Sequence, residues 1–172
     1  MRLDGRAALV VLLSIALLLN PSIAVANEAE FQVEFMVLNV YRDGLVHVTQ
    51  TVAVNETLPS VTLSLLASSV ENIIVVDENQ TVLDYEIDGV NMTVYSLGTK
   101  SIQLEYDTAS LTTKDADLWT LLLDTPYNLT VFLPEESIVW YLSPIPTSID
   151  TEDSRIKLSL FTGHWEISYE LP

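Results

Sequence analysis

Four asparagines in this 172-residue sequence stand in the N-glycosylation pattern Asn-x-Ser/Thr, and none of the four motifs has proline in its middle position. Such an asparagine can carry a glycan if the chain is exported and the motif lies at the surface. Two motifs fall in expected loops and two on the polar sides of expected strands, where a glycan would extend into solvent. The candidate glycosylation sites are Asn55, Asn79, Asn91 and Asn128.

Three short acidic clusters offer the oxygen ligands that calcium prefers. They lie at residues 77–79, 115–117 and 150–153. None of them has the ligand spacing and central glycine of an EF-hand loop, and turns between strands explain all three. We therefore expect no metal site and no cofactor.

The side chains that commonly perform catalysis do not form a recognisable set. The two histidines, His47 and His164, fall on the polar faces of expected strands, and we interpret both as exposed. The sequence has no cysteine, no nucleophile-elbow serine, no glycine-rich phosphate loop and no HExxH motif. A pair of carboxylates for glycoside hydrolysis depends on the fold and not on spacing, so it stays open. We expect a non-catalytic protein.

Aromatic residues offer one more kind of site, a platform on which sugar rings stack. Trp165 falls on the core face of its segment, and Trp140 and Tyr141 lie inside an apolar run over residues 138–142. We therefore expect core packing for most of the aromatic candidates. These candidates are Trp119, Trp140, Trp165, Tyr127 and Tyr141.

Strands must position these residues, because apolar and polar residues alternate with a period of two from residue 30 onward. In the last segment, Trp165, Ile167 and Tyr169 face one way and the polar residues between them face the other. Turn residues such as Asp88-Gly89 separate the segments. We predict strands at 31–41, 45–54, 61–66, 70–76, 81–87, 91–97, 100–106, 118–123, 127–133, 138–142, 155–160 and 164–171, and a short helical turn near 110–116.

So many short strands at regular spacing predict an all-β fold, namely an antiparallel β-sandwich of the Ig-like or jelly-roll-like kind. No internal repeat, linker or low-complexity stretch divides the chain. We therefore predict a single domain after the N-terminal segment.

Residues 1–26 have the order of a secretory signal peptide. Two arginines precede an apolar run at 7–19, and small residues follow up to Ala26. We predict cleavage after Ala26, which leaves one domain of residues 27–172. The alternatives are an uncleaved signal anchor and a pilin-type leader cut near Gly5. No second apolar run approaches the roughly 18 residues of a membrane span, so we expect none in the mature chain.

Charge and composition agree with export. The net charge is −17, and loss of the signal peptide, with two arginines and one aspartate, makes it −18. Such acidity argues against nucleic acid or anionic lipid as a partner. Without cysteine the domain must be held together by its core, which favours a prokaryotic or archaeal surface protein. We expect an extracytoplasmic protein, secreted or at the cell surface.

A family resemblance concerns the C-terminal half. The order of Glu105–Thr112, Trp119 and Tyr127–Pro134 is similar to that in the lumenal β-sandwich of ribophorin I, an accessory subunit of oligosaccharyltransferase. It also resembles exported archaeal β-sandwich proteins. The resemblance implies an accessory, non-catalytic role and transfers no functional residue.

Three hypotheses of function follow. The first is a non-catalytic, exported β-sandwich that acts as a cell-envelope interaction domain or accessory subunit, with a protein partner at the cell surface or with itself. The second is a pilus-like filament subunit assembled by strand sharing, with the apolar segment 31–40 as the donor strand. The third is a carbohydrate-binding or carbohydrate-active domain.

Overall fold

The structure, a computed structural model, describes residues 30–172, and all regular secondary structure in this range is β. The predicted all-β fold is therefore confirmed. The predicted signal peptide at 1–26 and its cleavage after Ala26 lie outside the described residues. Within the described range, no helix is long and apolar enough to cross a membrane.

The described chain contains fourteen strands. The twelve predicted segments correspond to twelve of them, with ends displaced by a few residues. The strands are β1 (Phe31–Val40), β2 (Val46–Val54), β3 (Ser60–Ser64), β4 (Glu71–Asp77), β5 (Tyr85–Asp88), β6 (Asn91–Tyr95), β7 (Ser101–Thr108), β8 (Thr112–Asp115), β9 (Leu118–Thr125), β10 (Leu129–Phe132), β11 (Ile138–Ser143), β12 (Ser148–Glu152), β13 (Arg155–Leu160) and β14 (Gly163–Glu170).

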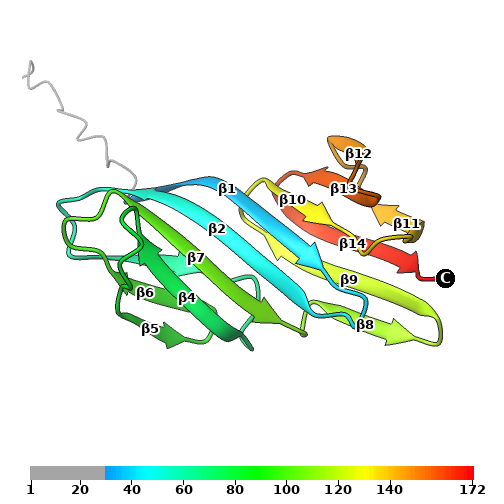
Figure 1. Ribbon diagram of the computed structural model, residues 1–172, viewed down its shortest axis with the longest axis horizontal. Helices are drawn as coiled ribbons and strands as arrows, with labels where there is room; N and C mark the ends of the chain where they lie inside the picture. The colour runs from blue at the N-terminus through cyan, green and yellow to red at the C-terminus, as the bar shows by residue number, and fades with distance from the viewer. Residues whose placement is uncertain (1–29) are drawn as a thin grey trace, which may run out of the picture.

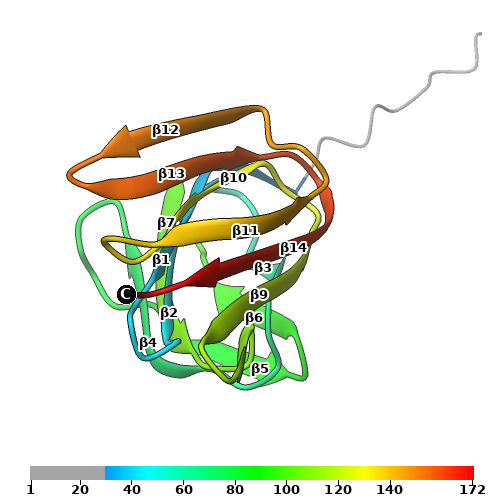
Figure 2. The same ribbon diagram turned by 90° about the vertical axis from the view of Figure 1, so that its right-hand side faces the viewer.

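Three sheets form a sandwich (Figures 1 and 2). The largest has seven strands in the order β12-β13-β10-β1-β2-β7-β4. A four-stranded sheet, β11-β14-β9-β8, and a three-stranded sheet, β3-β6-β5, complete the layers. All strand pairs are antiparallel except β1 with β10, which run parallel. This one parallel pair departs from the purely antiparallel sheets that we predicted.

One hydrophobic core joins the three sheets. Leu38 of β1, Leu63 of β3 and Ile167 of β14 belong to the same cluster, and each is 0% exposed. Because side chains alternate along a strand, each sheet has an inner face toward this core and an outer face away from it. Full burial of such a side chain contributes about 1.5–3 kcal/mol, so this shared core holds the sheets together.

Two strands were missed by sequence reasoning. The helical turn predicted near residues 110–116 is wrong, because Thr112–Asp115 forms β8 and pairs with β9. The second missed strand, Ser148–Glu152 (β12), is an edge strand of the seven-stranded sheet and is exposed over most of its length. Both strands are mostly polar and are held by backbone pairing. Because neither strand buries one of its faces in the core, apolar and polar residues do not alternate along it.

Contact between the first hairpin turn and β9 ties two sheets together at one end. Gly44, in the turn between β1 and β2, has a φ of +86°. A Cβ at this position would clash with the ring of Trp119. The hydroxyl of Thr112 donates a hydrogen bond to the carbonyl oxygen of Gly44. The four-stranded sheet is thus fixed against the turn of the larger sheet.

Candidate binding face

The four-stranded sheet has two strands whose sequences do not alternate. In the central strand β14, buried apolar residues alternate with polar ones from Trp165 to Glu170. Its neighbours β9 and β11 are instead apolar at nearly every position, with Leu-Trp-Thr-Leu-Leu-Leu at 118–123 and Ile-Val-Trp-Tyr-Leu at 138–142. Because successive side chains point to opposite faces, these strands place apolar groups in the core and also on the outer face.

Strand register shows which side chains share that outer face. Directly opposed residues in an antiparallel pair lie on the same side of the sheet. Leu118 and Ile138 both lie opposite Glu170, one from each neighbouring strand. Leu122 lies opposite Glu166. Leu118, Leu122 and Ile138 are therefore side by side with the carboxylates of β14 on the outer face.

A β-bulge in β11 adds two aromatic rings to the same face. Val139 opposes buried Tyr169, Tyr141 opposes Ser168, and Trp140 is the extra residue between them. A bulge interrupts the alternation and can re-aim a side chain. Trp140 is 67% exposed and Tyr141 49%. The indole Nε1 of Trp140 donates a hydrogen bond to Oε2 of Glu170 at 3.0 Å, which holds the ring beside β14.

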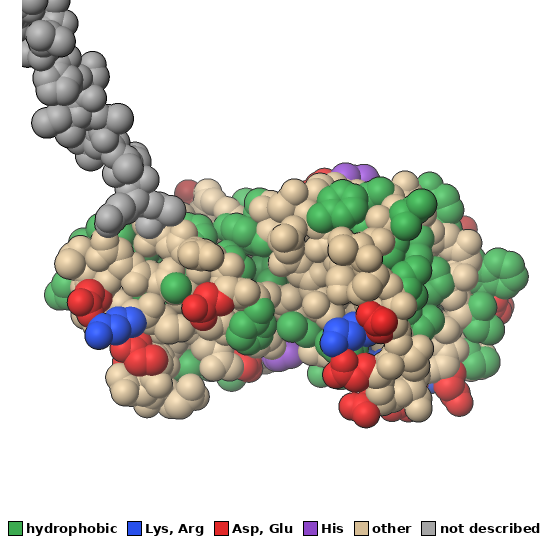
Figure 3. All heavy atoms as spheres, turned by 90° about the horizontal axis from the view of Figure 1, so that it is seen from above, with side chains coloured by type: hydrophobic (Ala, Val, Ile, Leu, Met, Phe, Trp, Pro, Cys, Tyr) green, Lys and Arg blue, Asp and Glu red, His purple; other side chains and the backbone are tan. Residues whose placement is uncertain are grey.

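We name these five side chains the apolar face. At its centre the hydroxyls of Thr120 and Ser168 are 3.1 Å apart and hydrogen-bonded to each other. Figure 3 shows hydrophobic side chains gathered at the right-hand end of that view, the end at which the C-terminus lies. The apolar side chains of β9 lie on one side of the polar residues of β14, and those of β11 lie on the other. Exposed apolar groups are common singly, but several of them on one face of a sheet make that face a candidate binding surface. The apolar face consists of Leu118, Leu122, Ile138, Trp140 and Tyr141, which are 39–67% exposed.

The outer face of the seven-stranded sheet carries a polar network, which we name the polar face. Nδ1 of His47 and Oδ1 of Asp107 are 2.8 Å apart, and Nδ2 of Asn72 donates to Oδ2 of Asp107 at 2.8 Å. Nε2 of His47 is 3.9 Å from Glu105, and Gln103 donates to the other oxygen of Glu105. The expectation that His47 is exposed is wrong, since its side chain is 28% exposed and paired.

Asp107 is the member of the polar face with a shifted pKa. Partial burial by itself would raise its pKa, but the hydrogen bonds from Asn72 and His47, together with the charge of His47, outweigh that effect. The net result is a lowered pKa for the Asp107 carboxyl. The second histidine, His164, pairs with Asp124 at 2.9 Å, and its side chain is 67% exposed, as we predicted.

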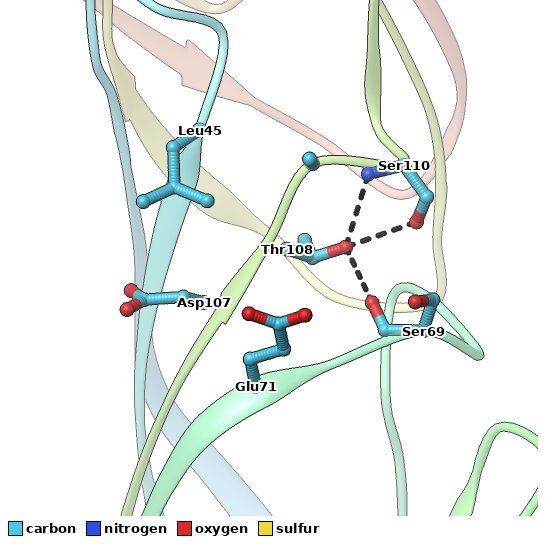
Figure 4. Close-up of a pocket in the computed structure, with 7 residues that line it drawn as sticks. Leu45, Ser69, Glu71, Asp107, Thr108 and Ser110 are labelled. Carbon is cyan, nitrogen blue, oxygen red and sulfur yellow. Dashed lines mark hydrogen bonds between the residues drawn. The ribbon is translucent and has the colours of Figure 1, made fainter.

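A pocket of about 320 Å³ lies beside the end of β7, close to Asp107 (Figure 4). The hydroxyl of Thr108 donates to the carbonyl oxygen of Ser69 and accepts from the backbone N–H of Ser110. The Ser110 hydroxyl has Thr108 as its partner, at 2.9 Å. Among the described residues, no hydrogen bond joins a serine to His47. The polar atoms of this pocket hold two loops together, which is a structural role.

Each of the three acidic clusters begins at the end of a strand and continues into the turn after it, namely after β4, β8 and β12. Oδ1 of Asp77 accepts hydrogen bonds from the backbone N–H groups of Thr81 and Asn79, each at 2.8 Å. These bonds, the one from Thr81 foremost, lower the pKa of Asp77 against the opposing effect of desolvation. Glu152 pairs with Lys157 at 2.6 Å. No group of three or more potential ligand side chains within residues 30–172 could hold a metal ion.

All four candidate glycosylation sites lie at the surface. Asn79, Asn91 and Asn128 are exposed, and Asn55 is half-buried in the loop after β2. Oδ1 of Asn55 accepts hydrogen bonds from the backbone N–H and the hydroxyl of Thr57, at 3.0 and 2.7 Å. This arrangement is an Asx turn that includes both ends of the motif. Glycosylation of these asparagines stays a prediction.

The five aromatic candidates separate into two groups. Trp165 is 0% exposed and donates from Nε1 to the carbonyl oxygen of Phe161, while Trp119 and Tyr127 pack against the core. Core packing is therefore confirmed for these three. It is wrong for Trp140 and Tyr141, because the bulge turns both rings outward.

Leu118, Leu122 and Ile138 were not recognised as site residues from the sequence. The available signal was the lack of alternation in 118–123 and 138–142, on either side of an alternating strand in the final sheet. In a two-layer sandwich each sheet has one face in water. Strands that are apolar on both faces therefore expose apolar groups.

Fold and site together define a β-sandwich with an exposed apolar sheet face. No protein-family model matches the chain, and no curated protein is similar to it in sequence. Among solved structures it is similar to an M1 zinc metallopeptidase from Deinococcus radiodurans, with 17% identity, a TM-score of 0.45 and coverage of 82% of this chain and 42% of that one.

A second solved structure is a mutant two-domain M1 zinc metallopeptidase bound to L-tryptophan. Its identity is 15% and its TM-score 0.47, over 83% of this chain and 43% of that one. This chain thus spans less than half the length of these proteins. At such identity and TM-score the matches assign neither a family nor an activity to it.

Proposed function

We propose that this protein is an exported, non-catalytic interaction domain that binds a component of the cell surface through the apolar face. The observation that carries the proposal is the set of five large apolar side chains, 39–67% exposed, on one face of the four-stranded sheet. Export is supported by the signal-peptide pattern of residues 1–26. An accessory role agrees with the resemblance to ribophorin I.

Strand sharing in a filament remains the alternative assembly. In the structure, β1 pairs with β2 on one side and with β10 on the other, both within the same chain. A donor role for residues 31–40 would require this central strand to leave its own sheet. Because Leu38 and Val40 of β1 are nearly fully buried, that exchange would open the core. This cost favours the interaction domain over the filament subunit.

Site-specific photo-crosslinking in the cells that produce the chain tests the proposal. A photo-reactive phenylalanine analogue is placed at Leu122 on the apolar face and, as the matched control, at Thr49 on the outer side of β2. We expect crosslinked adducts from position 122 and only background from position 49. Equal yields from both positions, or none from either, would contradict an interaction through the apolar face.

A further inference from the structure

We propose that the apolar face binds a neutral, extended polysaccharide, with the rings of Trp140 and Tyr141 as its stacking platform. This inference rests on the proposed function and names the chemistry of the bound component. It follows from the exposure of the two rings, the polar atoms beside them, the size of the face and its charge.

The two rings fit the apolar side of a sugar. A pyranose ring presents a patch of C–H groups that packs on an aromatic face, and Trp is the largest such surface in a protein. Trp140 donates a hydrogen bond from its Nε1 edge to Glu170 in the next strand, and 67% of its surface stays exposed. The bulge places Tyr141 on the same side, directly after it. A pair of adjacent exposed rings results.

Hydroxyl groups at the edge of a sugar need hydrogen-bond partners, and the neighbouring strand supplies them. Oε2 of Glu170 accepts from Trp140, and an ionised carboxylate retains further acceptor sites for a ligand hydroxyl. Glu166 lies on the same face, opposite Leu122 in one neighbouring strand and Ser143 in the other. Between the two carboxylates, Ser168 is 5% exposed and its hydroxyl is bonded to that of Thr120, so the carboxylates are the acceptors that a ligand can reach.

The size of the face favours a chain of sugars over a protein. Four strands spaced about 4.8 Å apart and about six residues long give a face of about 400 Å². Each partner in a stable protein complex buries about 800 Å². The sheet is an open platform, which fits the side of an extended polysaccharide better than a chain end that needs an enclosing pocket.

Charge restricts the ligand further. The chain carries a net charge of −17, and Glu166, Glu170 and Asp124 lie on or beside the face. These carboxylates would repel uronic acids and sulfated sugars. The same charges oppose close pairing of this face with a second copy of the chain. A neutral polysaccharide is not repelled by these carboxylates.

Binding of the purified exported protein to defined polymers tests the inference. The probes are insoluble cellulose and chitin in sedimentation assays, and mannan, xylan and polygalacturonate in affinity electrophoresis. We expect retention by at least one neutral polymer and none by polygalacturonate. Trp140→Ala and Tyr141→Ala should each weaken retention tenfold or more, and Trp140→Phe, which keeps a ring, should weaken it less. Phe35→Ala, which removes an exposed ring from another sheet, is the matched control and should leave it unchanged.

Tryptophan fluorescence gives a second readout that does not depend on a variant folding. Of the three tryptophans, Trp140 is the strongly exposed one, so a bound neutral polymer should shift the emission to shorter wavelength. Failure of all neutral polymers to bind, binding that survives Trp140→Ala, or binding to polygalacturonate alone would overturn the inference. Adducts to a protein or its attached glycan at position 122, without polymer binding, would overturn it while leaving the proposed function intact. Absence of both polymer binding and crosslinked adducts would contradict the inference and the proposed function alike.

Discussion

The outer faces of the two larger sheets differ in how their side chains meet solvent. On the polar face, the hydrogen-bonding groups of His47, Asp107 and Asn72 are partners of one another. On the apolar face, side chains such as Leu122 and Trp140 have no covering layer and contact solvent directly. Packing of the core requires neither arrangement on an outer face. The difference is what we expect if, as proposed, the apolar face serves binding and the polar face serves stability.

The largest expected effect separates two tryptophans of the same sheet. Trp119 faces inward against the Gly44 turn, and Trp140 faces outward. Trp119→Ala should lower the free energy of unfolding by about 3 kcal/mol, whereas Trp140→Ala should change it by no more than about 0.5 kcal/mol. Urea unfolding measures both. A comparable loss in the two variants would mean that Trp140 is a structural residue.

A smaller effect distinguishes two histidine–aspartate pairs. Asp107→Ala removes the partner of both His47 and Asn72 on the polar face and should cost about 1–3 kcal/mol. Asp124→Ala breaks the exposed pair with His164 and should cost less than about 1 kcal/mol. The midpoints of thermal or urea unfolding report the difference. Equal losses of stability in the two variants would show that the network of the polar face is no more stabilising than an exposed ion pair.

The lowered pKa of Asp107 predicts how stability changes with pH. A carboxyl whose pKa is lower in the folded state contributes stability that is present above its unfolded pKa of about 3.9. That contribution is lost as the pH falls through the lower folded value. In unfolding experiments between about pH 5 and pH 2, Asp107→Asn should lose less stability than the unmodified chain. An identical pH dependence in both proteins would contradict the pairing of Asp107.

The smallest effect on stability comes from the apolar face itself. Leu122→Ser should change the free energy of unfolding by no more than about 0.5 kcal/mol, because the side chain is already 41% exposed. The same change should reduce the fluorescence of a bound hydrophobic dye such as bis-ANS. Phe35→Ser, which removes an exposed ring from β1, should reduce it less. Equal reductions would show that the apolar face binds the dye no better than another exposed ring does.

Much of the fold could be predicted from the sequence because burial leaves a record in it. Strand β7 alternates Ile102, Leu104 and Tyr106 with polar residues, and each of the three is 0% exposed. Strands β8 and β12 leave no such record, since backbone pairing at a sheet edge holds them. The parallel pairing of β1 with β10 was also hidden, because it joins segments that are far apart in the chain.

The candidate site was harder to predict, because its signal in the sequence is a local loss of the alternation between apolar and polar residues. Apolar runs such as 138–142 are compatible with burial on both sides, which is how we first interpreted them. One extra residue at the bulge of β11 decides that Trp140 and Tyr141 both point outward. The position of a bulge depends on pairing with β14, and no residue type in the strand itself reveals it.

Hydroxyl-radical footprinting of the protein on its producing cells tests the role of the apolar face most directly. The extent of side-chain oxidation is compared between the cell-bound and the purified protein. We predict that Trp140 and Tyr141 are strongly protected on the cells, while Phe35 and Tyr41, which are 49% and 47% exposed elsewhere on the molecule, are oxidised equally in both states. Equal oxidation of Trp140 and Tyr141 in the two states would contradict binding through this face.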